Sequence, residues 1–447
     1  MRPPGRPKGE YRSAQHEGSP MRPPGRPKGE YLRSQHEGSP ATTAAPPAAA
    51  RTAALALAIT LGIQVYTSLA TAATAVLAPE IARDLGLPTA LIGVFVGLAY
   101  VGAASGSLAS GDFIARHGSI RVSQACVLFC AAGLVLLLPV TRAAGPGLAL
   151  IMLAPVIIGL GYGPITPASS HLLVRTAPPE RVALTFSIKQ TGVPAGVALA
   201  GAVLPGFALA YGWRPTFAVV AACGIVIVLV AQATRRRLDA DRSGSTRVSL
   251  RGVLAPLRLV LGQRDLAEMA LTAFAYAATQ MCLLSFLVVY LSEELGYSLV
   301  AAGLALTVAN VGGVAGRIVW GATADRFVHP KVLLGAIGVG TGACGYLAAA
   351  FSPGWPVVAV LAVCACFGAT AIGWNGVQLA QVARLAPAGQ AGAVTGAAGF
   401  ITFAGVVVGP PTFALLAGVT GSYRVGFVAF ASLALIGGLR LLYTHRK

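Results

Sequence analysis

Charge is scarce in this sequence. Only 11% of its 447 residues are Asp, Glu, Lys or Arg, whereas ordinary soluble domains contain roughly 25%. Hydrophobic residues make up 55% of the chain, and its mean hydropathy is +0.72. A soluble fold of this length could not bury so much apolar surface, so a lipid bilayer must surround much of the protein.

Motifs that carry enzyme chemistry are also lacking. The sequence has no GxxxxGK[ST] phosphate loop, no HExxH metal motif, no GxSxG that could serve a catalytic triad and no acidic cluster. Its seven cysteines all fall within apolar segments and form no CxxC pair, which favours packing roles over a disulfide or a metal site. We therefore expect that the protein is not an enzyme and that it holds no cofactor and no metal.

What the sequence contains instead is a series of twelve long apolar segments. Each is close to the roughly 20 residues that a helix needs to cross a bilayer. None shows the alternating pattern of a membrane β-barrel, and helices satisfy their own backbone hydrogen bonds in lipid. The sequence therefore predicts an all-α integral membrane protein. The predicted transmembrane helices lie near residues 53–78, 90–110, 119–140, 147–172, 183–209, 215–234, 266–291, 299–322, 331–350, 356–382, 390–417 and 422–443.

Basic residues are sorted between the loops that join these segments. If both termini are cytoplasmic, the inner loops hold most of the loop Lys and Arg residues, which follows the positive-inside rule and requires an even number of spans. The net charge of +18 is therefore a topology signal, and we expect no nucleic-acid partner. We predict a multi-pass protein of the inner (plasma) membrane with cytoplasmic N- and C-termini. The outer loops hold only Arg83, Arg142, Arg214 and Arg424.

The first 52 residues form a separate polar segment. Residues 1–20 recur as residues 21–40, and both copies are rich in proline, glycine and charge. Because such a composition cannot bury a core, we predict a disordered basic N-terminal tail over residues 1–52. The sequence leaves open whether this duplicated tail belongs to the mature protein.

The rest of the chain divides into two halves that resemble each other. The longest polar stretch predicts a cytoplasmic linker at residues 235–264, between six-helix bundles at residues 53–234 and 265–443, with residues 444–447 as a cytoplasmic C-terminus. The halves match at one constant offset, the separation of Gly93 from Gly303, which we call the repeat offset. Two such repeats in the same orientation form a transporter architecture with its site between the halves. The matching pairs include Gly93 with Gly303, Gly102 with Gly312, Gly106 with Gly316, Gly111 with Gly321, Arg116 with Arg326, and Arg214 with Arg424.

One loop carries a recognisable pattern. Residues 321–331, Gly-Ala-Thr-Ala-Asp-Arg-Phe-Val-His-Pro-Lys, resemble the signature loop of the major facilitator superfamily (MFS), in which a glycine is followed after three residues by Asp and Arg. In the first-half copy, Ala115 stands where the family usually has Asp, and Asp112 lies three residues earlier. The resemblance implies a bacterial 12-helix MFS transporter with two pseudo-symmetric six-helix bundles.

The signature loop also supplies candidate gating residues. We predict that Asp325 and Arg326, with Arg317 nearby, form an ion-pair latch at the cytoplasmic rim that holds one conformation and releases in the other. The alternative is that these charges only anchor the loop on the inner side. The gating candidates are Gly111, Asp112, Arg116, Arg317, Gly321, Asp325 and Arg326.

Acidic residues are absent from the centres of the predicted spans. A site for an organic cation, or a proton relay, usually needs a buried carboxylate, so cation efflux loses support. One cation does enter a span: Lys189 lies about two turns, or roughly 10 Å, into the fifth segment. It either binds an anionic group, or changes charge during transport, or extends to the cytoplasmic surface.

Uncharged polar side chains within the spans complete the candidate site. Each of them either faces a substrate cavity or makes a hydrogen bond between helices. The substrate-binding candidates are Gln64, Tyr66, Lys189, Gln190, Tyr276, Gln280, Asn375 and Gln378.

These features together predict a secondary active transporter that moves a small organic solute by alternating access. We expect an anionic or zwitterionic solute, and we leave the coupling ion open. The alternatives are efflux of a neutral or weakly charged drug-like compound by the same fold, and a transporter-like sensor. We expect the protein to be a monomer whose partners are the solute and the lipid bilayer.

Overall fold

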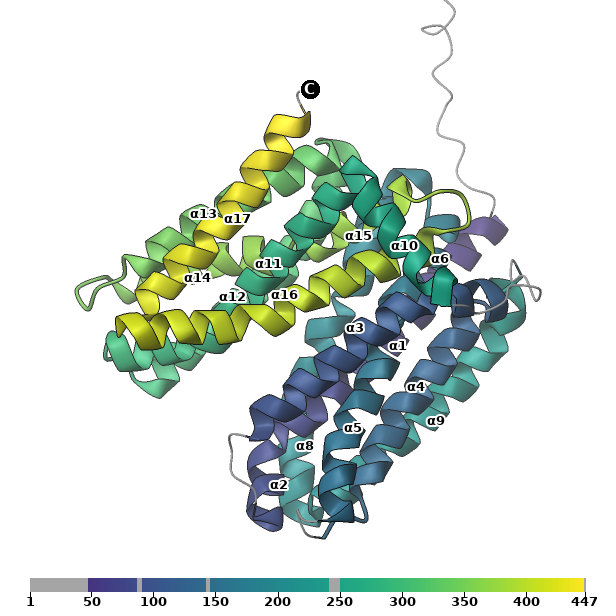
Figure 1. The fold of residues 1–447 in the computed structure, drawn as a ribbon, viewed down its shortest axis with the longest axis horizontal. Coiled ribbons are helices and arrows are strands. Elements are labelled where there is room, and N and C mark those ends of the chain that lie inside the picture. The colour runs from purple at the N-terminus through teal and green to yellow at the C-terminus, as the bar shows by residue number, and fades with distance from the viewer. Residues whose placement is uncertain (1–46, 87–90, 142–144, 241–249, 446–447) are drawn as a thin grey trace, which may run out of the picture. The chain divides into compact units, whose positions relative to one another are not determined.

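The computed structural model describes residues 47–86, 91–141, 145–240 and 250–445. Within these ranges the chain is helical and contains no strand (Figure 1). The disordered tail predicted for residues 1–52 falls outside the described residues up to residue 46, and the first helix already begins at Pro47. The described helices are α1 (Pro47–Val76), α2 (Ala78–Leu85), α3 (Leu91–His117), α4 (Ser119–Leu137), α5 (Pro146–Tyr162), α6 (Ile165–Thr176), η1 (Pro179–Arg181), α7 (Val182–Gln190), α8 (Gly192–Tyr211), α9 (Trp213–Leu238), α10 (Leu250–Gly262), α11 (Arg264–Val289), η2 (Tyr290–Glu294), α12 (Leu299–Arg326), α13 (Pro330–Ala349), α14 (Val357–Ala371), α15 (Asn375–Leu385), α16 (Ala391–Thr420) and α17 (Tyr423–His445).

Twelve of the described helical segments are long and apolar enough to cross a membrane, which confirms the predicted all-α membrane fold. Four of these spans are not single helices, and the seventh span continues from α11 into η2. The fourth combines α5 with α6, the fifth combines η1 and α7 with α8, and the tenth combines α14 with α15. The breaks place helix ends, with their free carbonyl groups, inside the membrane-spanning region.

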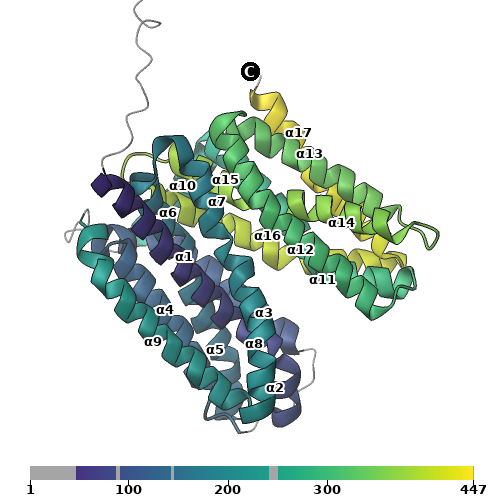
Figure 2. The same cartoon turned by 180° about the vertical axis from the view of Figure 1, so that it is seen from behind.

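The spans form two groups, as Figures 1 and 2 show from opposite sides. The first bundle contains α1, α3, α4, α5, α6, α7, α8 and α9, and the second contains α11 to α17. Within the bundles, α1 packs on α8, α3 on α5, α12 on α14 and α13 on α17. We call the end of both bundles that holds the start of α7 and the end of α12 the linker end, and the opposite end the distal end.

Glycine allows two of the closest helix contacts. A Cβ atom on Gly159 would lie 1.9 Å from the carbonyl oxygen of Ala99, and one on Gly368 would lie 1.8 Å from that of Ala309. Ala99 and Ala309 are separated by the repeat offset, so the same crossing occurs in each half. Close backbone approach of this kind supplies the van der Waals contact that holds helices together in lipid.

Each bundle is tied at its distal end by an acidic residue. In the first bundle, Asp84 accepts hydrogen bonds from Trp213 Nε1 (3.0 Å) and Arg214 (2.7 Å), and Arg214 also donates to the Val140 carbonyl. These hydrogen bonds, that of Trp213 first, lower the pKa of Asp84. We call this arrangement a distal clamp.

The second bundle has an equivalent distal clamp, whose Glu294 and Arg424 match Asp84 and Arg214 at the repeat offset. Glu294 accepts from Arg424 Nε and from the Tyr423 backbone N–H, both at 2.9 Å, and Arg424 also donates to the Phe351 carbonyl at 2.8 Å. The repeat predicted from Arg214 and Arg424 therefore extends to their acidic partners.

The linker contains a helix that the sequence interpretation did not include. Residues 235–264 were predicted as a polar connection, but α9 continues to Leu238 and α10 covers Leu250–Gly262. α10 contacts α3, α16 and α11. Pro256 and Val260 of α10 are buried whereas Arg258 is exposed, so the helix is amphipathic and has one apolar face against the bundles.

Candidate substrate site and gate

A cavity lies between the two bundles, with about 840 Å³ of empty space including its open mouth. Both halves of the chain contribute to its walls. Its polar lining includes Tyr100, Tyr162, Gln190, Gln280, Arg317, Asn375 and Gln378. A polar cavity shared by two repeats is where an alternating-access carrier binds its solute.

Arg317 is the cation that lines this cavity. It extends from α12 of the second bundle and is 2% exposed. Its Nε donates to the Ile372 carbonyl at 3.2 Å, and one terminal nitrogen donates to the Gln190 carbonyl of the first bundle. Both carbonyls lie at helix C-termini, whose partial negative charge favours a cation.

Lys189 lies one layer behind the cavity wall. It is 1% exposed and does not line the cavity. Its Nζ donates to Gln64 Oε1 at 2.6 Å, to Gln190 Oε1 at 3.1 Å and, more weakly, to Thr166 at 3.5 Å. All three partners are neutral and belong to the first bundle. Lys189 therefore stays inside this bundle and does not extend to the surface.

The opposite wall carries amide side chains. Asn375 donates to Gln280 Oε1 at 3.2 Å across α15 and α11, and both residues line the cavity. Gln378 also lines it and is 4% exposed, and its buried Nε2 has no hydrogen-bond partner among the described residues. A buried donor without a partner costs about 1–3 kcal/mol, so this amide is suited to an acceptor that enters the cavity.

Aromatic rings form the apolar part of the cavity. The ring of Phe403 lies 6.1 Å from that of Tyr100 and 6.3 Å from that of Tyr162, between centroids. Trp374 lines the cavity as well and packs edge-on against Tyr276. Such rings provide apolar contact area for the carbon skeleton of a small organic molecule.

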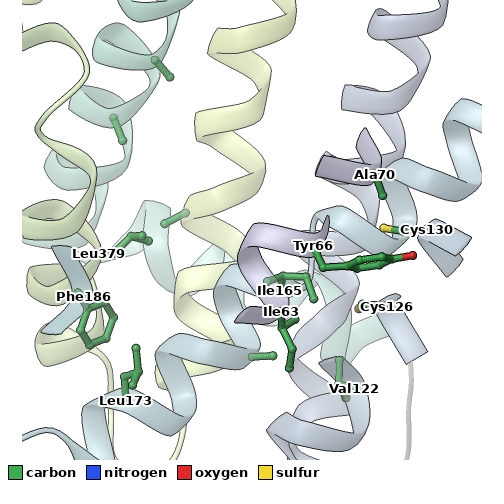
Figure 3. Close-up of a cluster of buried hydrophobic side chains, with 14 of the residues drawn as sticks. Ile63, Tyr66, Ala70, Val122, Cys126, Cys130, Ile165, Leu173, Phe186 and Leu379 are labelled. Carbon is green, nitrogen blue, oxygen red and sulfur yellow. The ribbon is translucent and has the colours of Figure 1, made fainter. Parts of the chain in front are cut away.

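Three more of the predicted substrate residues lie outside the cavity lining. Gln64 is buried and holds Lys189. Figure 3 shows Tyr66 inside the first bundle beside Ile63 and Cys130. Tyr276, its counterpart at the repeat offset, donates to the Leu334 carbonyl at 2.8 Å inside the second bundle.

Contacts between the bundles close the space at the linker end, and we call this set of contacts the candidate gate, or gate. The Asp325 carboxylate of the second bundle accepts hydrogen bonds from the backbone N–H groups of Ala183 (2.9 Å) and Leu184 (2.7 Å) in the first bundle. It also pairs with Arg384 at 3.3 Å. Asp325 thus caps the N-terminus of α7 across the two bundles, as an acidic residue does at a helix start.

The other predicted gating residues surround this contact. Gly321 lets α12 approach Ser187 of α7, since a Cβ atom there would lie 2.5 Å from the serine hydroxyl, and Gly111 packs in the same manner on Ala393. Asp112 is half-buried and lines a separate cavity beside α10. Arg116 and Arg326 are exposed.

Sequence reasoning missed several residues of the gate. Ser187 is fully buried between Gly321 and Gly376, and Ser107 donates to the Gly396 carbonyl across the bundles at 3.0 Å. Only the repeat could have indicated Ser107, because it matches Arg317 at the repeat offset. Serine is common at helix contacts in membranes, so residue type alone gave no signal.

Two helical bundles with a polar cavity between them are the architecture that membrane solute transporters use. The model of the Major Facilitator Superfamily matches residues 60–410, and the chain belongs to this superfamily.

Among curated proteins, the chain is 22% identical to the Hexuronate transporter of Bacillus subtilis (strain 168), over 58% of this chain and 61% of that protein. It is 27% identical to the 4-hydroxybenzoate transporter PcaK of Pseudomonas aeruginosa, over 42% of this chain and 41% of that protein. The chain therefore matches less than two thirds of the length of these relatives.

Solved structures support the fold. The fucose:proton symporter of E. coli superposes with a TM-score of 0.70 at 16% identity, over 88% of this chain and 99% of the other. The human organic anion transporter MFSD10 gives a TM-score of 0.66 at 17% identity, over 89% and 100% of the two chains. At these identities the likeness concerns the fold alone.

Proposed function

We propose that this protein is a secondary transporter for a small organic carboxylate, which it moves by alternating access. The observation that carries the proposal is a pair of buried cations at the central cavity. Arg317 lines the cavity and Lys189 lies directly behind Gln190 of its wall. Within the described part of the chain, neither cation forms an ion pair with Asp or Glu.

Electrostatics favours an anion at this place. A cation at the centre of a membrane span costs roughly 2.5–3.5 kcal/mol on insertion scales, and helix ends and neutral oxygens offset only part of that. A carboxylate that enters the cavity supplies the missing negative charge and can accept two parallel hydrogen bonds from a guanidinium group. The free amide of Gln378 offers a further donor.

The relatives support the same chemical class. Hexuronate and 4-hydroxybenzoate, which the names of two of them contain, are both organic carboxylates. The rings of Tyr100, Tyr162 and Phe403 suit the skeleton of such a compound. Efflux of neutral compounds by the same cavity is the competing function, and it would leave both cations without an anionic partner.

The position of the gate bears on the side of the membrane to which the cavity opens. The hydrogen bonds of Ser107 and Asp325 that join the bundles lie at the linker end. If the termini are cytoplasmic, as the loop charges predict, this end faces the cytoplasm and the cavity is outward-facing. We propose that the carboxylate enters from outside and leaves when the linker end opens.

The proposal is tested with matched pairs of acids and neutral analogues. The melting temperature of purified protein is measured with benzoate and benzamide, and with galacturonate and galactose. Ligands that bind the folded state raise the melting temperature in proportion to the logarithm of their concentration. At least one acid should stabilise the protein and its neutral partner should not.

The variant Arg317→Gln should lose the response to the acid. Arg236→Gln removes an exposed cation on α9 and should keep the response. Uptake of the labelled acid into proteoliposomes should follow the same order. Stabilisation by the neutral partners as strong as by the acids would overturn the proposal.

A further inference from the structure

Arg317 takes part in both the cavity and the closed end. Its guanidinium group lines the substrate cavity, and it also donates to the Gln190 carbonyl in the opposite bundle. Asp325, in contrast, joins the bundles from a position outside the cavity lining. At Arg317, therefore, an arriving anion can act directly on a contact that keeps the bundles together.

The Gln190 carbonyl is available because of a proline. In a continuous helix it would accept from the backbone N–H of residue 194, but that residue is Pro194, which has none. The neighbouring helical bond is formed, since Ala195 N donates to the Thr191 carbonyl at 3.1 Å. Arg317 therefore donates to a carbonyl that Pro194 leaves without its usual helical hydrogen bond.

The repeat shows that this position need not be charged. Ser107 in the matching helix α3 corresponds to Arg317 at the repeat offset, and its hydroxyl donates to the Gly396 carbonyl across the bundles at 3.0 Å. The first half thus makes an equivalent contact with a neutral side chain. The second half makes it with a cation, which a negative charge in the cavity can attract.

We propose that binding of an anionic substrate weakens the closed linker end by drawing Arg317 away from the Gln190 carbonyl. The inference rests on the proposed function, because it requires an anion in this cavity. A carboxylate carries a full charge and two acceptor oxygens, whereas a carbonyl at a helix end carries a partial charge, so the carboxylate is the stronger partner. The loaded transporter then opens inward more readily than the empty one.

The test measures how far the linker ends of the two bundles lie apart. Spin labels are attached to Glu180→Cys in the first bundle and Ala388→Cys in the second, both at exposed positions. The exposed native thiols are removed by Cys223→Ala and Cys366→Ala. Distances between the labels are recorded by double electron–electron resonance, with and without a carboxylate that stabilises the wild-type protein.

In the wild type we expect mainly a short distance without ligand and a larger population at long distance with the carboxylate. Arg317→Gln should raise the long-distance population about tenfold without ligand, the effect of one charge-assisted hydrogen bond, and should not respond to the carboxylate.

Pro194→Ala provides a second variant that leaves Arg317 in place. Its new backbone N–H competes for the Gln190 carbonyl, so it should also raise the long-distance population without ligand. Asp325→Asn is the matched control: it should open the gate without ligand and should still open further with the carboxylate.

Three outcomes would count against the inference. If both Arg317→Gln and Pro194→Ala stay closed like the wild type, the contact with Gln190 does not hold the gate. If the wild type binds a carboxylate and its distances do not change, coupling through Arg317 is refuted and the proposed function stands. If no carboxylate binds the wild type, the proposed function fails, and this inference fails with it.

Discussion

Asp325→Asn should shift the protein toward the conformation in which the linker end is open. The carboxylate accepts two backbone hydrogen bonds from the start of α7 and pairs with Arg384, and its side chain is 2% exposed. Asparagine keeps one acceptor oxygen and loses the charge. One charge-assisted hydrogen bond contributes about 1.5–3 kcal/mol and the charge at a helix start about 0.3–1 kcal/mol.

A combined loss of about 2–3 kcal/mol corresponds to a change of about 30- to 140-fold in the ratio of closed to open molecules. The spin-label pair at Glu180→Cys and Ala388→Cys reports this ratio directly. A shift of less than about threefold would show that the carboxylate does not hold the bundles together, because even one lost hydrogen bond should exceed it.

The matched control is Asp239→Asn. Asp239 accepts from the backbone N–H groups of Ile120 (2.8 Å) and Arg121 (3.0 Å), so it caps α4 as Asp325 caps α7, but within a single bundle. Asp239→Asn should therefore lower the melting temperature and leave the label distances unchanged. Equal effects of the two variants on the distances would refute the assignment of Asp325 to the gate.

Three further predictions concern other parts of the molecule. Lys189→Gln should raise the dissociation constant for the carboxylate about tenfold, since it removes one charge near the cavity, and Lys189→Arg should restore part of the affinity, both measured by calorimetry. Gly368→Ala should destabilise the protein by about 1–3 kcal/mol through a clash with the Ala309 carbonyl, whereas Gly201→Ala, with nothing within 4 Å of the new Cβ, should not lower the melting temperature. Hydrogen bonds lower the pKa of Asp84, so its carboxylate stabilises the folded protein at pH values above the unfolded pKa of about 3.9. This stability is lost as the pH falls through the folded pKa. Below about pH 4, the melting temperature of Asp84→Asn should therefore fall less steeply than that of the wild type.

The sequence was sufficient to predict the overall architecture, because the lengths and spacing of the segments can be counted along the chain. Segment lengths indicated the twelve spans, and the constant repeat offset indicated the two halves, whose distal clamps Asp84–Arg214 and Glu294–Arg424 the structure now displays. The signature loop indicated that Asp325 is important. Only the structure shows that its carboxylate accepts hydrogen bonds from the backbone of α7. The signature loop predicts a latch between charged side chains, whereas the contact between the bundles is made with the α7 backbone and the Asp325–Arg384 pair lies within the second bundle.

The side of each helix that faces the cavity was beyond the reach of the sequence. Spans such as α1 and α11 are apolar all round, so periodicity does not indicate their rotation. Tyr66 and Tyr276 were therefore as plausible as Gln280, yet both lie inside their bundles. The match of Tyr66 with Tyr276 at the repeat offset was a usable signal, since a shared position in both halves is more often structural than specific to a solute. The helix breaks beside Gln190 and Ile372, which determine the place of Arg317, depend on tertiary contacts.

The placement of the distal clamps has an energetic consequence for the transport cycle. Each clamp stays inside its own bundle, so among the described residues the mouth on that side has no ionic contacts to break or form when the bundles rock. The opposite mouth must separate the charged Asp325 carboxylate from the N-terminus of α7 each time it opens, and salt screens such an interaction. Ionic strength should therefore alter the inward-opening step and leave the outward-opening step nearly untouched, and the two half-cycles would differ in their response to salt.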